Sequence, residues 1–366
     1  AEPGAAENPG SSPARNTAVL PAVRLQGPEP TIDGLLEENV WSDAPVAEAF
    51  IQMEPEEGAP SSERTEARVL YGADALFVAI RAWDSRPDSI AAQLTRRDQE
   101  SYSDVVHVLI DSYFDRRTAF HFSVNPVGVK ADRYRYDDTE EDATWDAVWE
   151  VGTSVDVEGW TAEFRIPYSQ LRFGNQNYQT WGINFAREIA RKREVSSWAP
   201  VRHSDAAIVS KFGQLQGLEG LGSPTRAEFR PFSLARIDRR PGDEENPFYE
   251  ASDLRGSAGI DLKYGVTNNL TLDLTINPDF GQVEADPGQV NLSAFETFYP
   301  EQRPFFLEGA GIFNFGIGVG GGGLAEETLF YSRRIGRPPQ GYPDSQGGFS
   351  DTPDLATILG AWKLSG

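Results

Sequence analysis

Apolar and polar residues alternate in two adjacent segments between positions 104 and 132. Residues 105–110 form a continuous apolar run, and apolar side chains at Phe120, Phe122 and Val124 then alternate with small or polar ones. A period of two is typical of a strand with one buried face, and the polar segment between the two runs is typical of a turn. This part of the chain therefore predicts two paired strands of a β-sandwich.

Similar short apolar runs recur along residues 31–221. The segments ARVLYGADALFVAIRAWD and WDAVWEVGTSVDVEGWTAEFRIP each contain two runs around a turn, and KFGQLQGLEGL closes the series. No long helical period interrupts them. Many short strands at regular spacing predict an all-β fold with an antiparallel β-sandwich over residues 29–222.

The chain after Gly222 has another pattern. In IDLKYGVTNNLTLDLTINPDF, apolar residues alternate with Thr and Asp on both sides of Asn268 and Asn269, which predicts a β-hairpin. One apolar and one polar face is typical of a transmembrane barrel strand and also of a soluble sheet edge. Three or four such segments are too few for a closed barrel of about eight strands, so residues 223–366 are either the start of a barrel in a longer protein or a small sheet packed on the sandwich.

Composition excludes several classes of partner and site. Acidic residues outnumber basic ones by 56 to 33, for a net charge of −23, which disfavours nucleic acid and anionic membrane surfaces as partners. The chain has no cysteine, and its three histidines have no metal-ligand spacing, so a zinc site is not expected. His107 lies in an apolar strand and is interpreted as a structural residue.

One loop offers hard oxygen ligands, and no motif predicts catalysis. Carboxylates gather at Asp137, Asp138 and Asp142, which is the ligand type that calcium prefers, although a run of carboxylates is also typical of a solvated loop. The sequence lacks a GxSxG nucleophile elbow, and the glycine run from Gly316 lacks the lysine of a phosphate-binding loop. We expect a protein that is not an enzyme, with calcium as the one candidate cofactor.

The N-terminal segment is rich in small residues, proline and glycine. Residues 1–28 are therefore predicted to be a disordered linker that follows a removed signal peptide, as in an exported protein.

Two regions resemble known families. Residues 31–221 resemble the carbohydrate-binding module family 9 domain in the ordered strings IDGLLEENVW, LFVAIRAWD, SDVVHVLID, FSVNPVG, GWTAEFRIPYSQL and KFGQL. Residues 225–366 resemble the domain that follows it in a group of bacterial outer-membrane proteins, in strings such as LKYGVTNNLTLDLTINPDFGQVEAD and QVNLSAFETFYPEQRPFFLEGAGIF. In that group the region leads into a β-barrel. The resemblance implies a truncated barrel domain at the outer membrane or cell surface of a Gram-negative-type bacterium.

The first resemblance also implies candidate ligand-binding residues. Sugar-binding members hold a saccharide between two tryptophans, whose flat faces stack on the sugar ring. The matching positions here fall near Tyr102 and near Ala206, and neither is tryptophan. Tyr102 still offers one stacking face, Asn125 matches a polar position of the site, and Arg187 lies close to another. Trp198, beside a charged segment, is a further candidate for lining a groove.

These expectations leave three functions open. The first is a non-catalytic cell-envelope protein whose sandwich recognises a carbohydrate or glycoconjugate at the outer membrane. The alternative is a structural or assembly domain that contacts other envelope proteins without binding sugar. A membrane-associated hydrolase acting on glycans is the least expected.

Overall fold

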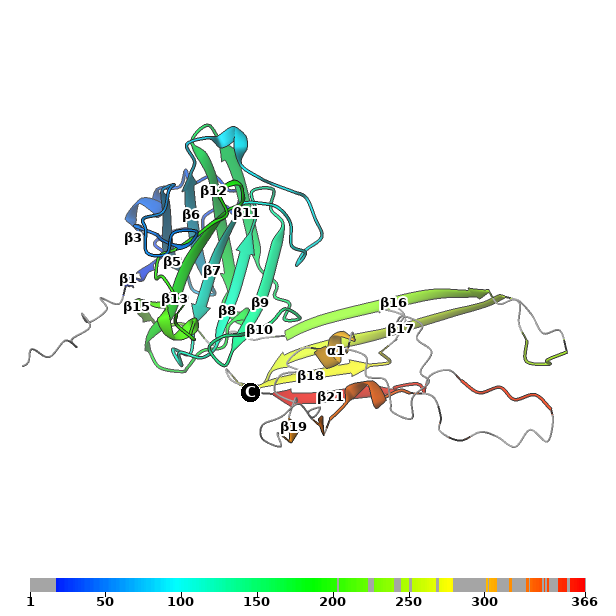
Figure 1. Ribbon diagram of the computed structural model, residues 1–366. Helices are drawn as coiled ribbons and strands as arrows, with labels where there is room; N and C mark the ends of the chain where they lie inside the picture. The colour runs from blue at the N-terminus through cyan, green and yellow to red at the C-terminus, as the bar shows by residue number, and fades with distance from the viewer. Residues whose placement is uncertain are drawn as a thin grey trace, which may run out of the picture.

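The computed structural model describes residues 18–202, 204–222, 227–239, 245–249, 252–267, 270–278, 301, 303–307, 316–317, 327–328, 330–337, 339, 341, 348–353 and 356–365. Residues 1–17 of the expected linker and the expected turn residues Asn268 and Asn269 lie outside this set. The fold is all-β, as the alternating pattern predicted (Figure 1).

Two sheets form the predicted sandwich. The first sheet has nine strands: β1 (Val19–Pro21), β4 (Ile51–Glu54), β7 (Val105–Asp111), β8 (Ala119–Val124), β9 (Lys130–Tyr136), β10 (Glu140–Asp142), β13 (Tyr178–Ile189), β14 (Glu194–Ser197) and β15 (Gly213–Glu219). The second sheet has six: β2 (Val23–Arg24), β3 (Val46–Ala47), β5 (Thr65–Tyr71), β6 (Ala75–Trp83), β11 (Glu150–Asp156) and β12 (Gly159–Pro167). The strands β7 and β8 pair in antiparallel register, which confirms the hairpin predicted between positions 104 and 132.

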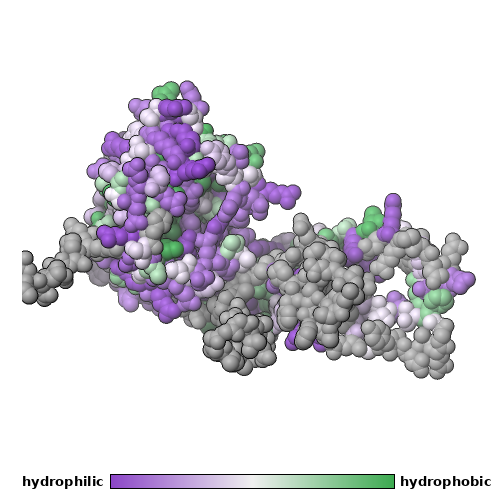
Figure 2. Space-filling view, viewed as in Figure 1, coloured by the Kyte–Doolittle hydropathy of each residue, from purple (hydrophilic) through white to green (hydrophobic). Residues whose placement is uncertain are grey.

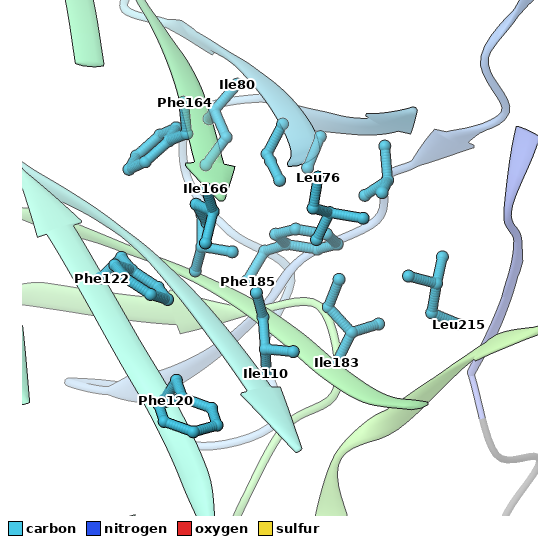
Figure 3. Packing of buried hydrophobic residues seen from close by; sticks show 14 of the residues in the cluster. Leu76, Ile80, Ile110, Phe120, Phe122, Phe164, Ile166, Ile183, Phe185 and Leu215 are labelled. Atoms are coloured by element: carbon cyan, nitrogen blue, oxygen red, sulfur yellow. The ribbon is translucent and has the colours of Figure 1, made fainter. Parts of the chain in front are cut away.

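Alternate side chains of both sheets meet in one apolar core. Phe120 and Phe122 of β8 face Phe164 and Ile166 of β12, and all four are buried (Figure 3). The Trp149 ring stacks on the Phe164 ring at a centroid distance of 5.6 Å. Burying one such side chain contributes about 1.5–3 kcal/mol, so this core stabilises the sandwich. Its outer surface is largely hydrophilic (Figure 2).

The sandwich begins earlier than the sequence predicted. β1 runs parallel to β15, with Val19 opposite Gln214, and β2 runs parallel to β5. The boundary predicted at residue 28 is therefore wrong, because residues 19–24 belong to the two sheets. Leu20 is buried in the core, and its contacts there outweigh the Pro- and Gly-rich composition of the segment before it.

A third sheet follows the sandwich in the chain. It is antiparallel in the order β16 (Ala227–Arg239), β17 (Ser252–Gly265), β18 (Thr271–Ile276) and β21 (Gly360–Ser365). The antiparallel pairing of β17 with β18 confirms the hairpin predicted after Gly222. Figure 1 shows this sheet extending away from the sandwich.

The two faces of the third sheet differ in polarity. One row across its four strands consists of Phe229, Leu262, Leu274 and Trp362, and the adjacent row on the other face consists of Glu228, Lys263, Asp273 and Lys363. Phe229 and Trp362 are 66% and 71% exposed, whereas Asp273 is 7% exposed. The Lys363 ammonium donates to the carbonyl oxygen of Phe305 at 2.9 Å, on the polar face. The apolar face is thus the exposed one.

Short elements complete the described chain. They are the 3-10 helices η1 (Asn39–Asp43), η2 (Pro87–Ser89), η3 (Tyr168–Gln170), η4 (Ala190–Lys192), η5 (Val209–Lys211) and η7 (Ser332–Arg334), the helix α1 (Pro304–Leu307), and the strand pair β19 (Gly316–Ile317) and β20 (Glu327–Thr328). Among the described residues, no helix has the length and apolar character needed to cross a membrane.

Candidate functional site

Polar side chains gather on the outer face of the first sheet. The alternation that sends Phe120 and Phe122 into the core places the intervening His121 on the opposite face, and the register puts Arg133 of β9 beside it. We call this surface the polar face and define it by His107, His121, Arg133, Arg135, Glu141 and Glu188. These side chains come from β7, β8, β9, β10 and β13, so five strands hold them in fixed positions.

Two histidines and a glutamate form a chain across the polar face. Nδ1 of His107 lies 3.0 Å from Nε2 of His121, and Nε2 of His107 lies 3.1 Å from Oε1 of Glu188. Burial lowers the pKa of His121 well below its usual range, and the positive charges of neighbouring groups lower it further, so the imidazole is neutral at pH 7. The contact with His107 lowers the pKa of Glu188, which is therefore a carboxylate.

Two arginines lie beside this chain and share one carboxylate. Glu141 accepts from Nη1 of Arg133 and from Nη2 of Arg135, the second at 2.6 Å. Glu100, in the segment before β7, approaches Arg133 at 3.9 Å. Burial lowers the pKa of Arg135, although the guanidinium remains charged at any physiological pH. The polar face therefore offers both donors and acceptors at fixed positions.

Tyr102 lies in the same segment as Glu100, and its ring is accessible. The side chain is 60% exposed, and the segment around it is fixed by the Ser103 hydroxyl, which accepts from the Gln93 amide nitrogen at 2.9 Å. The contact of Glu100 with Arg133 connects this segment to the polar face. Of the four residues proposed from the sequence to contact a ligand, Tyr102 is the one with an exposed side chain.

Asn125 is buried just after β8 and fixes the turn there. Its side-chain nitrogen donates to the carbonyl oxygen of Gln93 at 2.9 Å, and its side-chain oxygen accepts from the amide nitrogens of Val127 and Val129 at 3.2 and 2.9 Å. All of these partners are backbone atoms. Asn125 therefore positions the segment that carries Tyr102, and its side chain does not reach the surface.

Arg187 and Trp198 lie away from the polar face. Arg187 is fully buried, and Nη1 donates to the carbonyl oxygens of Trp83 and Arg64 at 2.8 and 3.1 Å, between the two sheets. Trp198 is half-buried, with its ring 5.9 Å from that of Phe185. Nη2 of Arg187 also lies 3.7 Å from the buried Asp84 carboxylate, so the sandwich encloses this side chain. The ligand-binding roles of Arg187 and Trp198 stay predictions.

The three aspartates proposed for calcium have separate partners. Asp138 accepts from the amide nitrogens of Ile208 and Ser210 at 3.0 and 2.9 Å, Asp137 pairs with Arg117 at 2.6 Å, and Asp142 accepts from the backbone of Thr144 at 2.9 Å. Across the described part of the chain, no three acidic, histidine or cysteine side chains gather as metal ligands would. The structure does not bring these aspartates together, and the calcium site stays a hypothesis.

A pocket of about 340 Å³ lies where the sandwich meets the third sheet. Its charged lining residues form ion pairs across it, with Arg230 at 3.7 Å from Asp146 and Lys363 at 3.8 Å from Asp273. Because opposite charges already neutralise one another there, the pocket has the character of a contact between two parts of the chain. The polar face is separate from it.

Sequence reasoning missed most of the polar face. His107 was interpreted as structural, and the other five members were not proposed as ligand contacts. The signal was present in the alternation itself, because a residue between two core phenylalanines of a strand must point to the opposite face. The alternation does not predict the pairing of β7 with β13, and this pairing brings Glu188 to His107.

Two regions of the chain match known protein families. Residues 32–204 match the family described as Carbohydrate family 9 binding domain-like. This part of the chain is therefore similar to a domain of that family. Residues 223–366 match the family described as Domain of unknown function (DUF5916). No curated protein matches the chain.

Among the solved structures that are similar to this part of the chain are two family 9 modules. One is a carbohydrate binding module family 9 from Caldicellulosiruptor kristjanssonii in complex with cellotriose, at 19% identity and a TM-score of 0.40 over 53% of this chain and 92% of that one. The other is a module from the same organism in complex with glucose, at 18% identity and a TM-score of 0.39 over 53% of this chain and 94% of that one.

Proposed function

We propose that the protein binds a carbohydrate or glycoconjugate through the polar face and the neighbouring ring of Tyr102. The observation that carries the proposal is the juxtaposition of fixed charged donors and acceptors with an exposed aromatic ring, on a domain like those of carbohydrate-binding family 9. Sugars present hydroxyl groups around their edge and apolar C–H faces, so they need both kinds of contact.

Each group has a defined role in the proposed complex. Glu188, whose side chain is 46% exposed, accepts hydrogen bonds from sugar hydroxyls. Arg133 donates to hydroxyl or ring oxygens, and the Tyr102 ring stacks on one face of the sugar. The proposed role is recognition alone. The chemistry needs no bond to break, which agrees with a binding module that has no catalytic function.

We further propose that the third sheet holds the protein at the outer membrane. Its exposed face carries Phe229, Leu262, Leu274 and Trp362, while the charged row faces the side where Phe305 lies. A sheet with a covered polar face and an exposed apolar face is stable when hydrocarbon takes the place of water on the apolar side. The sandwich would then be displayed at the cell envelope.

One observation favours the alternative, an assembly domain that contacts other envelope proteins. The position near Ala206, where sugar-binding relatives carry a second clamp residue, has no aromatic side chain. A single stacking ring gives a sugar less binding energy than two. The charged groups of the polar face would also suit a protein partner with matching charges.

The experiment is a glycan array on the full chain in detergent, followed by calorimetric titration of the best glycan. We expect Tyr102→Ala to weaken binding about tenfold, which is about 1.4 kcal/mol. Tyr178→Ala is the matched control, since Tyr178 is also exposed and lies at the start of β13. Equal losses in the two variants would exclude the Tyr102 site, and no binding across the array would favour the assembly domain.

A further inference from the structure

The apolar face of the third sheet follows its longest hairpin for most of its length. On that face β16 places an exposed residue at every second position from Ala227 to Ile237, and Ser233 is the one polar residue among them. β17 pairs with this stretch from Tyr264 to Leu254. At about 3.4 Å per residue the stretch is about 34 Å long. Strands of outer-membrane barrels tilt by about 35–45°, so its height would be about 24–28 Å, close to their apolar band of about 25 Å.

The two ends of this stretch have different surroundings. Beyond Ile237, the next residue of β16 on the same face is Arg239, which is exposed. Near the other end, Arg230 on the opposite face lies 3.7 Å from Asp146 of the sandwich. Figure 1 shows the sandwich at this end and the β16–β17 hairpin pointing away from it. One end of the apolar face therefore lies next to the sandwich, and the other ends at a charged residue.

The connections between the strands also differ at the two ends. Next to the sandwich, residues 266–270 join β17 to β18, and the amide nitrogen of Val266 donates to the carbonyl oxygen of Leu270 at 2.8 Å. Residues 240–251 join β16 to β17, and residues 277–359 join β18 to β21. Both of these longer connections leave from strand ends that point away from the sandwich. The short connection thus lies on the sandwich side of the sheet.

Part of the longest connection returns along the charged side of the third sheet. The carbonyl oxygen of Phe305 in α1 accepts from the Lys363 ammonium at 2.9 Å. Two residues before Phe305, Nη1 of Arg303 donates to the carbonyl oxygen of Ile335 at 2.8 Å, which holds two parts of this connection together. Trp362, on the apolar face next to Lys363, stays 71% exposed. These contacts therefore leave the apolar side of β21 accessible to lipid.

We propose that the third sheet crosses the outer membrane with its sandwich end on the periplasmic side and residues 240–251 outside the cell. In outer-membrane barrels, the turns on the periplasmic side are short and the loops on the outer side are longer. The third sheet has its short connection beside the sandwich and its longer ones away from it. The inference rests on the proposed anchoring of this sheet at the outer membrane. The polar face would then meet glycans of the periplasm and not intact polysaccharide outside the cell.

The orientation can be measured by labelling single thiols, because the chain has no cysteine of its own. Exposed positions for the thiol are Glu245→Cys in the far connection, with Pro247→Cys as a second position there, Val266→Cys in the short turn and Val157→Cys on the sandwich. The full chain is exported in a Gram-negative host, and intact cells are treated with a maleimide too large to cross the outer membrane. We expect the thiols at 245 and 247 to react at least about tenfold faster than the other two. All four should react alike once the outer membrane is permeabilised.

Membrane fractionation of the same cells separates the failure of the orientation from the failure of the anchoring. If the full chain is not in the outer-membrane fraction, the proposed anchoring fails. If it is in that fraction and Val157→Cys reacts in intact cells as fast as Glu245→Cys or faster, the orientation is overturned and the anchoring stands. Thiols at 245 and 247 that react no faster than Val266→Cys in intact cells overturn the orientation too, because the far connection then does not reach the outside.

Discussion

The sandwich and the third sheet use the same alternation of apolar and polar residues with opposite results. In the sandwich, Phe122 and Phe164 are buried in the core between the sheets, and the polar neighbours His121 and Glu163 point to the opposite faces of their sheets. In the third sheet, Trp362 is exposed and Thr275 is buried. A period of two therefore specifies that a strand has two unlike faces, and the surroundings decide which of the two faces water.

The largest expected difference concerns the core. Trp181→Ala should lower the free energy of unfolding of the sandwich by about 3–5 kcal/mol, because Trp181 is fully buried and a cavity replaces its ring. Trp362→Ala is the matched change in the third sheet and should alter the same free energy of unfolding by less than about 0.5 kcal/mol. Urea unfolding of both variants measures the effect. Similar losses in the two would remove the contrast between the regions.

The next effect concerns the apolar face of the third sheet. Phe229→Lys or Trp362→Lys should weaken binding of the full chain to phospholipid vesicles by about 2–4 kcal/mol, since a charge would have to enter hydrocarbon. Flotation with the vesicles measures the bound fraction. Val157→Lys is the control, because Val157 is 91% exposed on the sandwich. If the control weakens flotation as much, the apolar face does not contact lipid.

A smaller effect on the stability of the sandwich is expected for Asp138. Burial alone would raise its pKa, but hydrogen bonds from Ser210, Ile208 and Val209 outweigh burial and lower it. Because the pKa of Asp138 is lower in the folded protein than its value near 3.8 in the unfolded chain, the carboxylate stabilises the fold above pH 3.8. This stabilisation is lost as the pH falls through the pKa of the folded state. Asp138→Ala should cost about 1–3 kcal/mol at pH 7 and much less at pH 2. Urea unfolding at the two pH values checks this, and an equal cost at both would contradict it.

The smallest effect is expected where the two regions meet. Arg230 and Asp146 form an ion pair at 3.7 Å whose side chains are both exposed to a large extent. Exposed pairs contribute about 0–1 kcal/mol. Arg230→Ala should therefore change the unfolding of the sandwich by less than about 0.5 kcal/mol. A loss above 1 kcal/mol would mean that the sandwich depends on the third sheet for its stability.

Local pattern was sufficient for the strands that pair with their neighbours in the chain. The hairpins β7–β8 and β17–β18 were predicted because a turn signal joins two alternating runs. Local pattern did not predict β1, because its partner β15 lies nearly the whole length of the sandwich away in the sequence. A parallel partner at that distance leaves no local signal.

The candidate site was predicted less well than the fold. Tyr102 is exposed, and its role in binding stays a prediction. Arg187 sits between the sheets, where Nη1 donates to the carbonyl oxygens of Arg64 before β5 and of Trp83 at the end of β6. A sequence shows an arginine in a strand but not which backbone oxygens will surround it. The contact of His107 with Glu188 likewise depends on strand order, which residue spacing does not encode.

The central claim is that the polar face binds carbohydrate, and NMR mapping of the full chain in detergent tests it most directly. On titration with a glycan selected by the array, the account predicts concentration-dependent shift changes at His107, His121, Arg133, Glu188 and Tyr102, with the third sheet unchanged. Saturable binding whose shifts lie in the pocket around Arg230 and Lys363, with the polar face unchanged, would contradict it.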